Sequence, residues 1–87
     1  MRKPYTHVKS DMQDLSSVKI ELGERVRKLR AERGLSQEYL AHETGFGRSS
    51  LSSIERGKKD VRISTLLKLA AIFEISLSQF LNGIGEK

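Results

Sequence analysis

The amino-acid sequence predicts an all-α fold, a compact bundle of five short helices. Apolar residues recur at intervals of three and four positions, no segment alternates as a β-strand does, and serines and glycines fall where the helical segments begin and end. A chain of 87 residues has room for a single hydrophobic core. We therefore expect one domain over residues 16–82, preceded by an N-terminal arm (1–15) and followed by a C-terminal tail (83–87).

The first helix is predicted by a stripe of apolar residues between positions 15 and 29, which lie on one side of a helix with 3.6 residues per turn. Either Ser16 or Ser17 can cap its N-terminus, because a hydroxyl accepts a hydrogen bond from a free amide of the first turn. Gly34 follows the stripe and can adopt the left-handed conformation in which many helices end. The helix should thus span about four turns.

The second helix is expected to begin after Ser36, which is a good N-cap residue, and to end at Gly45. A third helix over about residues 47–56 carries Leu51 and Ile54 on one side. Its remaining positions are mostly small and polar, with middling helix propensity, so packing must hold it in place.

A charged loop, residues 58–62, separates the third helix from a broadly apolar helix that starts near Ser64. Ser76 can cap a last short helix, and Asn82 with Gly83 can stop it. These two helices are expected to close the core.

Composition and charge narrow the class of protein. The net charge is +5, there is no cysteine, and no run of about 18 apolar residues or secretion signal is present. We expect a cytoplasmic protein with no membrane attachment, and nothing in the sequence calls for a cofactor. His7 and His42 do not form a metal-ligand spacing. The chain also lacks paired carboxylates on one face, a nucleophile with a base and a glycine-rich phosphate loop, so we do not expect an enzyme.

Positive charge is concentrated in two stretches. Residues 25–33 hold five basic residues against one acidic residue, and residues 48–62 hold five against two. Such runs are often solvated helix faces. If the fold brings the two stretches together, they favour a polyanion as the partner.

The segment from Gln37 to Arg56 has the spacing of a helix-turn-helix. Two helices that meet at a steep angle need a small residue at their contact, a glycine-like turn four residues later, and apolar residues on the second helix that face back. Ala41, Gly45 and Leu51 meet these needs.

Four motifs follow one another along the chain: LGERVRKLR at 22–30, RGLSQEYLA at 33–41, IERG at 54–57 and ISTLLKLA at 63–70. In this order they resemble the Cro/cI-type (phage-repressor-like, XRE-type) helix-turn-helix regulators. The resemblance covers about residues 20–82. It implies a lambda-repressor-like DNA-binding domain of five helices.

The resemblance also implies which residues contact DNA. Base-reading positions at the recognition helix are Arg48, Ser49, Ser52 and Ser53. Backbone contacts are implied at Gln37, Ser50, Lys58, Lys59 and Arg62. Chemistry supports the first assignment, because an arginine in the first turn of a recognition helix can donate two hydrogen bonds to guanine O6 and N7. Gln37, at a helix N-terminus, can position a phosphate without reading sequence.

Other basic residues are expected to serve structure or solubility. By the same resemblance, Arg30 and Glu55 form a buried or half-buried ion pair between the first and third helices. The other basic residues of the 25–33 stretch are expected to be solvated, namely Arg25, Arg27, Lys28 and Arg33.

The leading hypothesis is a transcriptional regulator, a repressor or controller protein, that binds double-stranded DNA in a sequence-specific manner. One small domain covers one half-site, so a homodimer on a palindromic operator is expected. Phe80, Leu81 and Ile84 are candidates for its apolar contact surface. The alternative is a protein-binding module, such as an antitoxin that neutralises a partner toxin.

Overall fold

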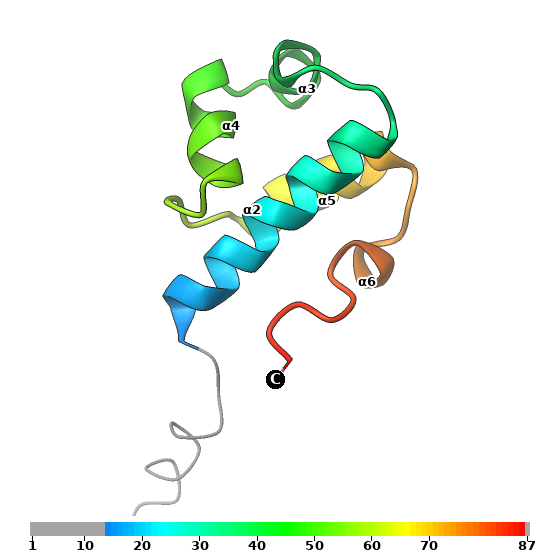
Figure 1. The fold of residues 1–87 in the computed structure, drawn as a ribbon. Coiled ribbons are helices and arrows are strands. Elements are labelled where there is room, and N and C mark those ends of the chain that lie inside the picture. Colours follow the sequence, from blue (N-terminus) through cyan, green and yellow to red (C-terminus); the bar gives the residue numbers. More distant parts are fainter. Residues whose placement is uncertain (1–13, 87) are drawn as a thin grey trace, which may run out of the picture.

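The computed structural model describes residues 14–86, and within this range all regular structure is helical (Figure 1). The five helices are α2 (Leu15–Glu32), α3 (Gln37–Thr44), α4 (Arg48–Glu55), α5 (Ile63–Phe73) and α6 (Leu77–Phe80). The predicted all-α class is confirmed. Nearly all of the predicted arm lies outside the described residues. Across residues 14–86, no helix is long and apolar enough to cross a membrane.

Helix α2 begins earlier than the sequence analysis predicts. Its N-cap is Asp14, whose Oδ1 accepts a hydrogen bond of 2.9 Å from the amide of Ser17. The prediction of a cap at Ser16 or Ser17 is therefore wrong. A carboxylate is as good a cap as a hydroxyl and also interacts favourably with the positive end of the helix dipole. Leu15, which was assigned to the arm, is the first residue of the helix.

The predicted stops at Gly34 and Gly45 and two of the predicted caps agree with the structure, whereas α6 ends at Phe80, before the predicted stop at Asn82 and Gly83. Gly34 and Gly45 adopt φ values of 65° and 78°, in the left-handed region that glycine enters without steric cost. The hydroxyls of Ser36 and Ser76 cap α3 and α6. These short connections fix the angles between successive helices.

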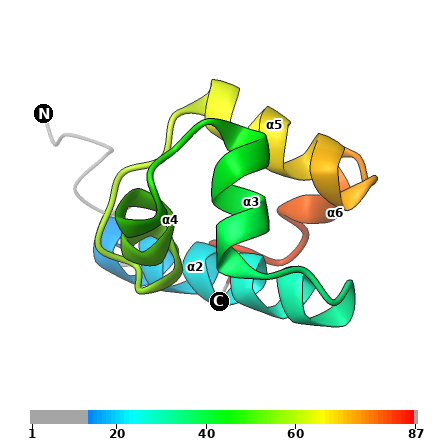
Figure 2. The same ribbon diagram turned by 90° about the horizontal axis from the view of Figure 1, so that it is seen from above.

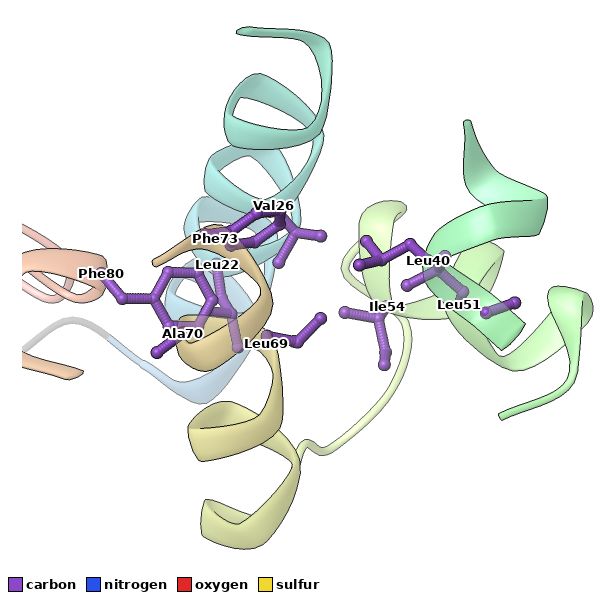
Figure 3. Close-up of a cluster of buried hydrophobic side chains, with 10 residues drawn as sticks. Leu22, Val26, Leu40, Leu51, Ile54, Leu69, Ala70, Phe73 and Phe80 are labelled. Atoms are coloured by element: carbon purple, nitrogen blue, oxygen red, sulfur yellow. The ribbon is translucent and has the colours of Figure 1, made fainter. Parts of the chain in front are cut away.

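The core is one cluster to which every helix contributes (Figure 3). Its fully buried large side chains include Leu40 of α3, Leu51 of α4 and Leu69 of α5. Phe73 and Phe80 pack edge to face, with ring centroids 5.9 Å apart. Because Phe80 is completely buried, it cannot belong to an exposed dimer patch, and that part of the prediction is wrong.

Helix α4 is held very close to α2. A methyl group on Gly23 would overlap with the backbone carbonyl oxygens of Ile54 and Glu55, so only glycine allows this approach. The contact joins the middle of α2 to the C-terminal end of α4. It sets the position of α4 on the surface of the bundle.

Two arginines that were expected to be solvated instead hold helix ends. Arg25 donates hydrogen bonds of 2.7 Å to the carbonyl oxygens of Phe80 and Asn82, and Arg33 Nε donates one of 2.9 Å to the carbonyl oxygen of Phe73. The guanidinium of Arg33 also lies 5.7 Å from the centroid of the Phe73 ring. Free carbonyl groups at helix C-termini attract cations, which explains both contacts.

Candidate nucleic-acid interface

Helices α3 and α4 are joined by a tight turn, and their axes run in clearly different directions (Figure 2). Ala41 is buried where the helices meet, and Leu51 and Ile54 of α4 point into the core. The hydroxyl of Thr44 is satisfied within α3 by the carbonyl oxygen of Leu40, at 2.8 Å. These features form the predicted helix-turn-helix.

The outer side of α4 is polar and made of short side chains. Arg48 and Ser49 are exposed at its N-terminal end, while Ser50, Ser52 and Ser53 are half-buried. The N-cap is Gly47, which supplies no side-chain hydrogen bond. A helix with one arginine and four serines on its open side can approach another surface closely.

Of the predicted base-reading residues, Arg48 and Ser49 are exposed, and Arg48 carries the only long side chain among the four. Its side chain is 65% exposed and lies at the first position of the helix. Its Nη1 is 3.6 Å from Oε2 of Glu38, a residue in the first turn of α3. This pair is not predictable from the sequence, because it depends on how the turn brings the starts of the two helices together.

A buried network connects α2, α3 and α4. Glu55, which is only 4% exposed, accepts two hydrogen bonds from Arg30, at 2.7 and 3.1 Å, and one of 3.0 Å from Nε2 of Gln37. Arg30 also donates to the carbonyl oxygen of Leu35, at 3.0 Å. The structure thus contains the expected Arg30–Glu55 ion pair and adds Gln37 to it. The bidentate geometry and the extra donor satisfy the buried carboxylate.

Three of the predicted backbone contacts gather around one surface depression of about 340 Å³. It lies between the α3–α4 turn and the loop before α5, and its lining includes Ser50, Lys59 and Arg62. Lys58 is exposed on the same loop but does not line the depression. Asp60, which does line it, pairs with Lys19 of α2 at 3.6 Å. The structure therefore joins α4 and the basic loop into one surface.

Tyr39 is another residue whose position the sequence did not indicate. It lies on α3, and it is about half exposed. The buried face of that helix consists of Leu40, Ala41 and Thr44.

The chain is similar in sequence to known helix-turn-helix proteins. The helix-turn-helix family matches residues 26–80. The transcriptional regulator PuuR of Escherichia coli is 41% identical over 58 residues, which are 67% of this chain and 31% of PuuR. The chain thus spans about a third of the length of that regulator.

Two solved structures are similar in fold as well as in sequence. The crystal structure of the restriction-modification controller protein C.AhdI from Aeromonas hydrophila has a TM-score of 0.68 and 39% identity, over 71% of this chain and 94% of the controller. The biofilm regulator SinR, in a crystal structure with DNA, has a TM-score of 0.64 and 35% identity, over 70% of this chain and 98% of the SinR chain in that structure. Together with the family match, these similarities show that the chain belongs to the Cro/cI-type helix-turn-helix family of regulators.

Proposed function

We propose that this protein is a transcriptional regulator that binds double-stranded DNA in a sequence-specific manner, with α4 in the major groove. The observation that best supports this proposal is the distribution of buried and exposed side chains on α4. Its three buried residues fix it to the core, and its open side presents an exposed arginine and short polar residues beside a basic loop. A major groove is wide enough to admit such a helix.

Base reading is assigned mainly to Arg48. From the first position of α4 its guanidinium can donate two hydrogen bonds to O6 and N7 of one guanine. A contact of this kind contributes about 1–3 kcal/mol of discrimination against other bases. Ser49, Ser52 and Ser53 are short enough to act directly or through water, and their individual contributions are smaller.

Backbone contacts are assigned to Ser50 of α4, to the loop 58–62 and to the start of α3. Ser50, Lys59 and Arg62 surround the same depression, so they can bind one phosphate or two neighbouring phosphates, and Lys58 adds charge nearby. Gln37 uses one N–H of its amide for Glu55. An amide group has two such donors, so the second can bind a phosphate and link the backbone to the buried ion pair.

We further propose that the protein acts as a symmetric homodimer. Residues 14–86 carry one helix-turn-helix, which covers one half-site, and a second copy would read the other half-site one helical turn away, about 34–36 Å from the first. With Phe80 buried, the exposed apolar residues of α5 replace it in the proposed contact surface. Ile63 and Leu67 lie one helical turn apart and are 70% and 53% exposed, and Leu81 and Ile84 are half-buried.

The function is tested by selecting bound sequences from random duplex DNA and measuring affinity for the selected site at several salt concentrations. We expect a palindromic consensus and a slope of several units in log K against log salt, since several phosphates are neutralised. Recovery of no consensus would refute sequence-specific binding. The regulators and controllers named above give the antitoxin alternative no support.

A further inference from the structure

An acidic side chain lies at the proposed DNA-binding surface, directly beside the base-reading arginine. Oε2 of Glu38 is 3.6 Å from Nη1 of Arg48, and the two side chains are 76% and 65% exposed. A carboxylate on a surface that faces phosphates opposes binding to every DNA sequence. Its presence needs a reason other than affinity.

We propose that Glu38 is a positioning residue that raises sequence specificity by acting through Arg48. The inference rests on the proposed function of α4. Glu38 lies in the first turn of α3 and Arg48 begins α4, and only a short turn separates these two helices (Figure 2). The turn thereby sets the position of the acid relative to the recognition helix.

The chemistry of the guanidinium makes this role possible. It carries five N–H donors in one plane, so an ion pair through Nη1 leaves enough donors for two hydrogen bonds to guanine. The same pairing restricts the rotation of a long, flexible side chain, which lowers the entropy lost when Arg48 binds a base.

On DNA that lacks the correct guanine, the guanidinium of Arg48 can bind a phosphate instead of a base. Such a contact is independent of the base sequence. It would break the ion pair and leave the carboxylate of Glu38 unpaired near the backbone. Glu38 therefore weakens binding to the wrong sequence more than binding to the operator.

The chain offers a matched control for charge. Glu43 is exposed on the same helix, and it is not the carboxylate that pairs with Arg48. Glu38→Gln and Glu43→Gln each remove one negative charge from α3 and keep the shape of the side chain. Both should bind all DNA somewhat more tightly, but only Glu38→Gln should change the preference among sequences.

The experiment measures Kd for the selected operator and for a scrambled duplex of the same composition at one salt concentration. For Glu38→Gln we expect the ratio of the two affinities to fall about two- to fivefold, the range that corresponds to one exposed ion pair. Glu43→Gln should keep the wild-type ratio. In an Arg48→Ala background, Glu38→Gln should no longer change the ratio.

The mobility of Arg48 in the free protein is tested without DNA. NMR relaxation of the Arg48 Nε–Hε group should show greater mobility in Glu38→Gln than in the wild type and Glu43→Gln. Three results would overturn the inference: unchanged mobility of Arg48 in Glu38→Gln, an unchanged ratio of operator to scrambled-duplex affinity in Glu38→Gln, or an equal fall of that ratio when Glu38→Gln is made in the Arg48→Ala background. With any of these results, a high ratio for the wild-type protein means that only the role of Glu38 is wrong. A ratio of one for the wild-type protein would instead overturn the proposed function itself.

Discussion

The buried carboxylate of Glu55 allows a quantitative prediction. Glu55→Ala removes three hydrogen bonds at once, two with Arg30 and one with Gln37, and leaves the guanidinium without its counter-charge. Breaking a buried ion pair from one side costs about 3–5 kcal/mol. The Arg30 side chain is 19% exposed and keeps its bond to the Leu35 carbonyl, so we expect the lower end of this range. For a domain of this size, about 3 kcal/mol corresponds to a fall in Tm of roughly 12–24 °C.

Thermal unfolding followed by far-UV circular dichroism measures this effect. Glu43→Ala, at an exposed position of α3, is the control and should stay within about 0.5 kcal/mol of the wild type. Replacing both partners, as in Arg30→Met with Glu55→Leu, should cost less than Glu55→Ala, because no unpaired charge remains. If Glu55→Ala lowered the free energy of unfolding by less than about 1 kcal/mol, the view that the Arg30–Glu55–Gln37 network holds α4 in place would be refuted.

Three further predictions concern packing, DNA contacts and assembly. Gly23→Ala should lower the free energy of unfolding by about 1–3 kcal/mol in chemical denaturation, because the added methyl group overlaps with two carbonyl oxygens of α4. A free energy of unfolding equal to that of the wild type would show that α2 can move away from α4. In a binding titration, Arg48→Ala should relax the preference at one base position of the selected site. Lys59→Ala should weaken binding to all duplexes alike and lower the slope of log K against log salt by about one. The reverse pattern would exchange the roles of the two residues. Leu67→Glu should yield monomers in analytical ultracentrifugation with little change in Tm, and a persistent dimer would place the contact elsewhere.

Local chemistry made much of the fold predictable. Gly34 and Gly45 mark helix ends because few other residues tolerate their positive φ, and Ser36 and Ser76 cap helices through contacts only three residues away. The inward-facing residues of α4 follow from helical periodicity alone. Arg48 falls in the first turn of that helix because the helix is expected to begin at about residue 47, just after the turn at Gly45.

Features that depend on tertiary packing were not predictable. The choice of Asp14 over Ser16 as N-cap is a competition between neighbouring good caps, which the apolar pattern does not decide. Arg25 binds carbonyl groups that lie more than fifty residues away in the sequence. The pairing of Glu38 with Arg48 likewise requires the geometry of the turn, because charge patterning along one helix does not report on its neighbour.

The most direct test of α4 as the reading helix is dimethyl sulfate protection of guanine N7, which lies in the major groove. On the selected operator, the wild-type protein should protect one guanine in each half-site, and Arg48→Ala should leave that guanine open to methylation when the DNA is saturated. Protection that persists in Arg48→Ala, or a bound operator without any protected guanine N7, would contradict the account.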